Sequence, residues 1–283
     1  MKRIDAHQHF WRLSRGDYAW LTPDLDKLHR DFEPADLAPL LAQNGIVASV
    51  LVQAAATEKE KHFLLELARE HAFIKGVVGW ADFEAPDIAR RIAALVEVGA
   101  GKLKGLRPMI QDIADPDWVA RAQLDAAFAA MIDHDLVFDA LVRPEHFPAL
   151  RSRLRRNPQL QVVIDHAGKP DIAHEGYEAW APRIEALAVE PNVSCKLSGL
   201  LTEAKADAAM GDLAPYAEQI FSCFGRGRVM WGSDWPVLNL ASDYSTWLAM
   251  ARRLVARYAS GHESAVFGGT AARMYRLDSQ AFA

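Results

Sequence analysis

Val229-Met230-Trp231-Gly232-Ser233-Asp234-Trp235-Pro236 is an apolar run that ends in a carboxylate and a proline. Because proline cannot donate a hydrogen bond within a sheet, we predict a buried strand over Val229–Asp234 that stops there. Gly232 shares a strand face with Asp234 and is expected to leave space beneath it for a water or a ligand. The next helical pattern begins only near Asp243, which is the better N-cap candidate, so we expect Asp234 to serve chemistry rather than capping.

Similar short runs alternate with helical patterns along the whole chain. The other predicted strands are Arg3–His9, Ile46–Gln53, Ile74–Trp80, Gly101–Arg107, Leu136–Val142, Gln161–His166 and Asn192–Leu197. Amphipathic stretches between the strands include Lys59–His71, Pro86–Val98, Leu124–His134, Ala179–Val189, Ala214–Phe224 and Tyr244–Tyr258. Eight strands, each followed by a helical segment, predict an α/β fold, a single (β/α)8 TIM barrel, with residues 1–283 as one domain. An open doubly wound sheet is the rival, but no Gly-x-Gly-x-x-Gly turn follows any predicted strand.

The predicted connections differ in length between the two ends of the strands. Long strand-to-helix joints occur at Phe10–Pro34, Pro108–Trp118 and Ser198–Gly211, whereas helix-to-strand joints such as Asn44-Gly45 are short. In a barrel, the strand-to-helix loops all emerge at the C-terminal face, where active sites are built. We therefore expect the functional residues at the ends of the strands.

Composition excludes several classes of partner. The 283 residues are 51% hydrophobic and 24% charged with a formal net charge of −5, and no basic stretch interleaves with aromatics. We therefore do not expect nucleic acid or a membrane as a partner, and we expect a small-molecule substrate. No apolar segment follows Lys2-Arg3, and neither Cys195 nor Cys223 lies in a Cys-x-x-Cys pair. We predict a cytoplasmic protein with two reduced thiols.

The first predicted strand carries two histidines, in Asp5-Ala6-His7-Gln8-His9. Since strand side chains alternate with a period of two, His7 and His9 project to the same side. At the end of a barrel strand that side can be the interior, where two imidazoles can share a metal ion or a substrate oxygen. An isolated His-x-His pair lies as often on an ordinary wet strand face.

Three further strand ends carry ionisable residues. Asp165 and His166 are adjacent, so only one is expected to line the barrel axis; we favour His166, with Asp165 supporting it. Taken alone, His166 is more often a hydrogen-bonded structural histidine. Arg107 can hold a carbonyl, hydroxyls or a carboxylate by bidentate contact. Lys196 is more readily explained as an internal salt-bridge partner.

Four tryptophans fall at or just beyond predicted strand ends, namely Trp11, Trp20, Trp80 and Trp235. An aromatic wall suits the face of a sugar or another ring, and on that ground Trp11, Trp80 and Trp235 are candidate substrate-binding residues. For each tryptophan singly, core packing is the alternative.

The order of these motifs resembles the amidohydrolase superfamily, in its amidohydrolase-related (type 2) branch. The strings that carry the resemblance are Asp5-Ala6-His7-Gln8-His9-Phe10-Trp11, Gly105-Leu106-Arg107-Pro108, Asp165-His166-Ala167-Gly168-Lys169-Pro170, Leu197-Ser198-Gly199-Leu200 and Gly232-Ser233-Asp234-Trp235-Pro236. They are similar to those of the sugar-lactonase group, which includes L-fuconolactone and L-rhamnonolactone hydrolases and, more distantly, pyrone-dicarboxylate lactonase. The resemblance covers essentially the whole chain.

The resemblance implies a metal question that the residues leave open. Many members of the superfamily hold two metals with a histidine on the fifth strand, but here that strand reads Leu136-Val137-Phe138-Asp139-Ala140-Leu141-Val142. A single divalent ion, zinc or manganese, on His7, His9 and Asp234 is one expectation, and metal-free catalysis is the other.

The resemblance also implies a reaction. We expect Asp234 to take a proton from the water that attacks a lactone carbonyl, while His7, His9 and Arg107 stabilise the oxyanion. Asp234 or His166 then returns the proton to the leaving alkoxide. Two alternatives stay open: a metal-dependent, non-oxidative decarboxylase of a small aromatic or enoic acid, and a barrel that binds a sugar acid without turnover. Release of CO2 favours the first, and saturable binding without product favours the second.

Overall fold

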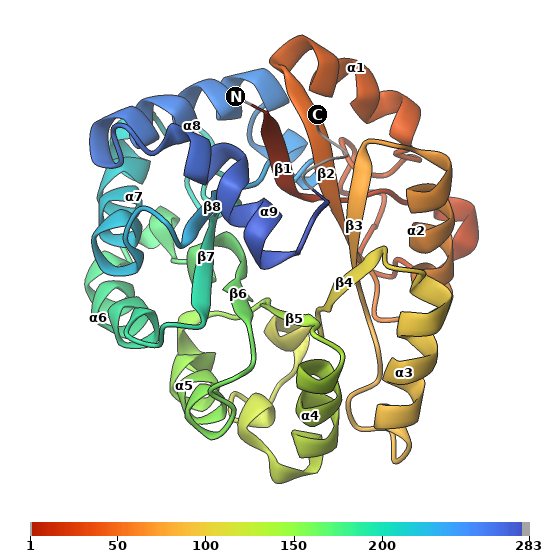
Figure 1. The fold of residues 1–283 in the computed structure, drawn as a ribbon. Coiled ribbons are helices and arrows are strands. Elements are labelled where there is room, and N and C mark those ends of the chain that lie inside the picture. The colour runs from red at the N-terminus through yellow and green to blue at the C-terminus, as the bar shows by residue number, and fades with distance from the viewer. Residues whose placement is uncertain (1, 279–283) are drawn as a thin grey trace.

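The computed structural model describes residues 2–278, which form one sheet of eight parallel strands in the order β1 to β8. The strands stand at the centre of the molecule and the helices surround them (Figure 1). The strands are β1 (Arg3–Gln8), β2 (Ile46–Val52), β3 (Ile74–Gly79), β4 (Leu103–Leu106), β5 (Val137–Ala140), β6 (Val162–Ile164), β7 (Val193–Leu197) and β8 (Val229–Trp231). The predicted (β/α)8 barrel is confirmed.

The helices follow the strands one by one. They are α1 (Pro34–Asn44), α2 (Glu58–Glu70), α3 (Ile88–Gly99), α4 (Asp125–Asp133), α5 (Phe147–Arg156), α6 (Tyr177–Ala188), α7 (Met210–Phe224), α8 (Tyr244–Tyr258) and the short α9 (Thr270–Met274). Gly45, at φ +64°, ends α1 in the left-handed conformation that glycine adopts without strain. Asp243 caps α8 as predicted, because its carboxylate accepts from the backbone N–H of Thr246 at 2.9 Å. Across residues 2–278, the structure contains no helix that is both long and apolar enough to span a bilayer.

The barrel closes between its first and last strands. Gln8 pairs in parallel with Trp235, and the backbone N–H of His9 donates to the carbonyl of Trp235 at 2.8 Å. Inside, small and branched side chains from the strands pack against α9 and the residues after it, including Ala48, Val137, Val163, Met274 and Tyr275. The short final helix therefore fills the lower part of the barrel, opposite the strand ends that were expected to carry function.

Seven of the eight predicted strands extend one to three residues beyond the observed C-terminal end of the strand. In three of them the excess contains a candidate catalytic residue. β1 stops at Gln8 rather than His9, β6 at Ile164 rather than His166, and β8 at Trp231 rather than Asp234. The backbone turns left-handed at His166 (φ +51°) and at Asp234 (φ +60°), which ends the extended conformation that pairing requires. His9, His166 and Asp234 therefore lie on the turns that leave the barrel, whereas His7 lies on β1.

Candidate active site

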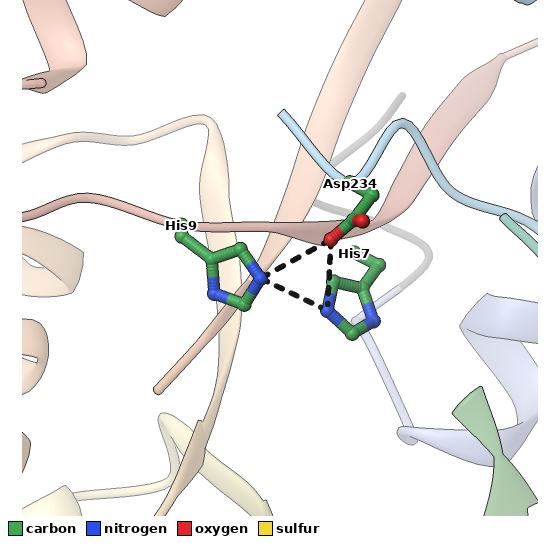
Figure 2. A group of neighbouring side chains, drawn as sticks. All are labelled: His7, His9 and Asp234. Atoms are coloured by element: carbon green, nitrogen blue, oxygen red, sulfur yellow. Dashed lines mark hydrogen bonds and ion pairs between the residues drawn. The ribbon is translucent and has the colours of Figure 1, made fainter. Parts of the chain in front are cut away.

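His7, His9 and Asp234 converge at the C-terminal end of the barrel, where β1 and β8 meet. The two Nε2 atoms lie 3.1 Å apart, and the Oδ1 atom of Asp234 lies 3.3 Å from His9 Nε2 and 3.7 Å from His7 Nε2. Figure 2 shows both imidazole rings turning a nitrogen toward the same carboxylate oxygen. The structure thus brings together the three residues that the sequence proposed as a group.

His166 completes the cluster from the turn after β6. Its Nε2 atom lies 3.8 Å from Asp234 Oδ1, and its Nδ1 atom lies 2.9 Å from the hydroxyl of Ser198. The ring fits against Gly199, where a Cβ atom would lie 2.6 Å from Nδ1 of His166. Ser198 and Gly199 follow directly after β7, so this loop fixes the position of the imidazole.

The left-handed turn at His166 changes which side chains face the barrel axis. We expected only one of Asp165 and His166 to do so, but both contact His7: Asp165 Oδ1 lies 3.4 Å from His7 Nδ1, and the His166 and His7 rings are 4.5 Å apart. The period-two rule fails here because it holds only in an extended backbone. Gly232 also differs from expectation, since a Cβ there would lie 2.7 Å from His7 Cβ. The glycine makes room for His7 rather than for a water or a ligand.

Burial sets the protonation states of the cluster. It lowers the pKa of His166 to about 4 and lowers the pKa of His7 well below the usual range, with the charge of Lys196 adding to the effect on His7. Burial alone would raise the pKa of Asp234, but His166, His9 and His7 outweigh it and hold that pKa below its usual range. At neutral pH the cluster therefore combines an ionised carboxylate with neutral His7 and His166 rings.

Arg107 is held rigidly beside the cluster. Its guanidinium donates to the backbone carbonyl of Gln53 and, at 3.2 Å, to Asp165 Oδ2, while Nη1 lies 3.3 Å from His7 Nε2. The side chain is 4% exposed. The structure therefore presents a fixed positive charge at the pocket, with its orientation set by the protein.

A cavity of about 320 Å³ opens above the cluster. Its lining contains His9, Arg107, His166 and Asp234, together with Trp20, Ala54, Met109, Gln111, Asp112, Leu141, Lys169, Thr202, Glu203, Val237 and Leu240. His7 is fully buried and lies behind this wall. His9, Arg107, His166 and Asp234 can therefore touch a ligand. His7 supports them from behind.

The tryptophans are distributed differently from the expected wall. Trp11 and Trp235 are buried against Phe32, with ring centroids 5.3 Å from it in each case, and are absent from the cavity lining. Trp80 lines a neighbouring cavity of about 490 Å³. Trp20 lines both cavities and donates from its indole N–H to the carbonyl of Ala54 at 2.8 Å. Among these four side chains, Trp20 alone reaches the space above Asp234.

Sequence reasoning missed several polar residues of the site. Lys169 and Glu203 form an ion pair at the cavity wall. The side-chain amide of Gln53 donates to the backbone carbonyl of Arg107, and the guanidinium of Arg107 donates to the backbone carbonyl of Gln53. Lys169 and Ser198 were noticed only as parts of motif strings. The position of these residues could have indicated their role, because each of them lies in a loop that follows a strand.

The donor atoms of the cluster fit a single divalent cation. His7, His9 and Asp234 each offer one ligand atom, and these atoms all lie within 4.8 Å of one another in a buried setting. His9 Nδ1 lies 2.8 Å from the carbonyl of Val52, which only accepts, so His9 Nε2 keeps its lone pair toward the cluster. Two imidazoles and one carboxylate suit zinc or manganese. On the fifth strand, Asp139 is occupied by an ion pair with Lys196 instead.

Comparison with known proteins identifies a matching family and several similar proteins. The family model described as Amidohydrolase matches residues 4–277. The L-fucono-1,5-lactonase of Burkholderia ambifaria is 46% identical over 280 residues, covering 98% of this chain and 96% of that protein. The L-fucono-1,5-lactonase of Burkholderia multivorans is 40% identical over 293 residues, covering 99% and 97%. A crystal structure of an amidohydrolase from Burkholderia multivorans with bound zinc has a TM-score of 0.92 and 39% identity, covering 98% of this chain and all of that one.

Proposed function

The chain belongs to the amidohydrolase family, and we propose that it is a lactonase that opens a sugar lactone of the L-fucono-1,5-lactone type to its hydroxy acid. The observation that carries this proposal is the carboxylate of Asp234 beneath the cavity, in contact with His9 and within 3.8 Å of His166. The two similar proteins named L-fucono-1,5-lactonase support this reaction over decarboxylation and over binding without turnover.

Asp234 is the general base in this proposal. Its depressed pKa keeps it ionised at neutral pH, and it lines the cavity where a water can lie. The carboxylate takes a proton from that water as the oxygen attacks the lactone carbonyl carbon, and the carbonyl oxygen becomes an oxyanion.

Arg107 stabilises the negative charge that develops on the carbonyl oxygen. Arg107 is a fixed cation beside the cluster, and its contacts with Gln53 and Asp165 mean that it need not reorganise when the oxyanion forms. His9 and His166 also line the cavity, whereas His7 supports His9 from behind.

Collapse of the tetrahedral intermediate breaks the ring C–O bond and produces an alkoxide. The proton taken from water returns from Asp234, directly or through His166, to that oxygen. The product is a hydroxy acid that ionises in neutral solution, so turnover acidifies the medium.

A divalent cation at His7, His9 and Asp234 is part of the proposal as an optional group. When bound, it would supply Lewis-acid polarisation of the carbonyl oxygen or lower the pKa of a water. The similar structure with bound zinc supports such a site, and the identity of the ion is left to experiment.

The cavity walls suit a deoxy-sugar ring. Leu141 and Val237 offer apolar surface for a methyl group, while Gln111, Lys169 and Glu203 offer polar groups to hydroxyls. Trp20 gives an indole face at the same opening. This mixture favours a polyhydroxylated lactone with one apolar substituent.

The test is a pH-indicator assay of acid release across five- and six-membered aldonolactones, with enzyme before and after chelation. We expect the fastest acidification with L-fucono-1,5-lactone and related deoxy-sugar lactones, and none from the Asp234→Asn variant. Silence across the whole panel, with zinc and manganese added back, would reject the lactonase proposal and favour decarboxylation.

We also propose that residues 1–283 work as one domain and that the enzyme acts in the cytoplasm. Both cysteines are free thiols, and Cys195 is buried. Reduced cysteines suit a reducing compartment.

A further inference from the structure

A buried charged layer lies beneath the cluster, and the proposed reaction assigns no role to its central group, Lys196. Lys196 of β7 stands at its centre: its Nζ atom lies 2.6 Å from Asp139 Oδ2, 2.9 Å from Asp165 Oδ1 and 3.1 Å from His7 Nδ1. Tyr275, just after α9, donates its hydroxyl to Asp139 Oδ2 at 2.7 Å. Lys196 and both carboxylates are completely buried.

Lys196 Nζ makes hydrogen bonds to Asp139 Oδ2 and to Nδ1 of His7, and its contact with Asp165 Oδ1 is an ion pair. An ammonium group donates three hydrogen bonds and accepts none, so the nitrogen of His7 that faces it must be the acceptor. A neutral imidazole has only one acceptor nitrogen, and its hydrogen is therefore on the other one. Because Lys196 donates to Nδ1 of His7, the hydrogen of the His7 ring lies on Nε2.

The alternative tautomer makes poorer contacts. With a hydrogen on Nδ1, His7 would donate to Asp165 Oδ1 at 3.4 Å and would meet an N–H of Lys196 at 3.1 Å. On the opposite side, Arg107 Nη1 lies 3.3 Å from His7 Nε2, and one of the two hydrogens on Nη1 has Asp165 Oδ2 as an acceptor at 3.2 Å. The contact of Arg107 with His7 is longer than the 3.1 Å contact of Lys196 with His7 Nδ1. The shorter contacts therefore favour the hydrogen on Nε2.

His9 is complementary to this state of His7. Because its Nδ1 donates to the carbonyl of Val52, its Nε2 is an acceptor, and it lies 3.1 Å from His7 Nε2. The hydrogen bonds then run in one direction, from Lys196 to His7, from His7 to His9, and from His9 to Val52. Each donor in this chain meets an acceptor.

The direction of these hydrogen bonds determines whether His7 can bind a cation. A histidine ligates a metal through a nitrogen that carries a lone pair, and its other nitrogen donates to a neighbouring acceptor. His9 meets this condition as it stands, whereas His7 presents an N–H to the cluster. To become a ligand, His7 must move its hydrogen to Nδ1, and Lys196 must withdraw the hydrogen bond that it makes there.

We infer that Lys196 is a positioning residue that fixes His7 in the Nε2–H tautomer and thereby weakens the binding of a divalent cation to His7, His9 and Asp234. The inference rests on the ligand assignment made in the proposed function, but on neither the substrate nor the reaction. Lys196 thus holds His7 as a hydrogen-bond donor to His9.

The first test reads the tautomer in the unaltered protein. Ring 15N signals of histidine-labelled, chelator-treated full-length enzyme distinguish a hydrogen on Nδ1 from one on Nε2, and His7→Asn and His9→Asn variants assign the two residues. We expect His7 to carry its hydrogen on Nε2 and His9 on Nδ1. A hydrogen on Nδ1 of His7 overturns the inference.

The second test measures zinc affinity by competition with a chromogenic chelator. Removing Lys196 alone would leave two buried carboxylates without their partner, so the variant is Lys196→Met with Asp139→Asn, which removes one charge of each sign. We expect this double variant to bind zinc at least about tenfold more tightly than the wild type, the scale typical of changes around metal ligands, with the hydrogen of His7 now on Nδ1.

Asp139→Asn alone is the matched control, because it keeps Lys196 and should keep both the wild-type zinc affinity and the Nε2–H tautomer. Equal zinc affinity in the double variant and the control, including no binding by either, overturns the inference. So does tighter binding without a change of tautomer. No substrate enters either measurement, so a negative lactone assay and a negative result here are separate findings.

Discussion

The backbone N–H of Asp234 donates to the carbonyl oxygen of His7 at 2.8 Å, across the seam where β8 meets β1. Asp5 strengthens the same seam, because its Oδ1 atom accepts from the backbone N–H groups of Ser233 at 2.8 Å and His7 at 3.1 Å. The closure of the barrel and the spacing of the proposed base and imidazole are therefore one structural feature. A change that loosens the seam should be felt in both.

Tyr244→Phe tests the seam from outside the cluster. The hydroxyl of Tyr244 donates to Asp5 Oδ2 at 2.9 Å, and both side chains are buried. Loss of this donor leaves a buried carboxylate oxygen without a partner, so we expect the free energy of unfolding to fall by about 1–3 kcal/mol. Urea unfolding measures it. Tyr177→Phe is the control, because the hydroxyl of Tyr177 is half-buried and makes a longer, 3.4 Å contact with Gln219. Equal stability of the two variants would contradict the argument.

Asp234→Asn tests the base. The amide keeps the size of the side chain but cannot take a proton from water, so we expect kcat to fall by several orders of magnitude, about 10⁴-fold, with the fold retained. Asp171→Asn, at an exposed carboxylate paired with His174, controls for the substitution itself. Turnover near the wild-type rate in Asp234→Asn would remove Asp234 from the base role.

Gly199→Ala tests the seat of His166. The added methyl would lie 2.6 Å from the imidazole, and the backbone there has φ +65°. We expect kcat to fall about 10²-fold as the ring is displaced, with KM less affected. Gly261→Ala has a similar φ of +79° with open space around it, so it carries the backbone strain without the contact. Similar kcat values for the two variants would show that the ring position is not critical.

The barrel and the membership of the cluster were predictable from the sequence, for a physical reason. Apolar strands ending in ionisable residues recur along the chain, and parallel strands bring their ends to one face, so His7, His9, His166 and Asp234 had to gather there. The prediction needed only local pattern and topology.

The details that were missed depend on backbone turns and on distant contacts. Both Asp165 and His166 reach His7 because the chain turns left-handed after Ile164, which alternation cannot reveal. Trp11 was placed at the mouth but packs against Phe32, since the first loop folds back on itself through their mutual backbone hydrogen bonds. Lys196 was expected to form an ion pair, and it does, but its contact with His7 spans 189 positions and follows from no local signal.

Glu60 gives a prediction about pH. From α2, its two carboxylate oxygens accept from the backbone N–H groups of Ala54 and Ala55, each at 2.9 Å, and so hold the loop after β2 that forms part of the cavity wall. Burial outweighs these hydrogen bonds and raises the pKa of Glu60 from 4.5 to about 7. The folded protein therefore binds this proton more tightly than the unfolded chain does, and the associated stability is lost as the pH rises through about 7.

Glu60→Gln removes this titration. We expect the stability of the wild type relative to Glu60→Gln to fall by about 2 kcal/mol between pH 5 and pH 8, since one pKa unit corresponds to about 1.4 kcal/mol. Urea unfolding of both proteins at the two pH values measures it, and contributions from other groups cancel in the difference. Glu66→Gln, on the exposed face of the same helix, is the control and should follow the wild type. A difference between wild type and Glu60→Gln that stays constant with pH would mean that Glu60 holds the loop as a carboxylate throughout this range, and that its burial is fully offset by the two backbone donors.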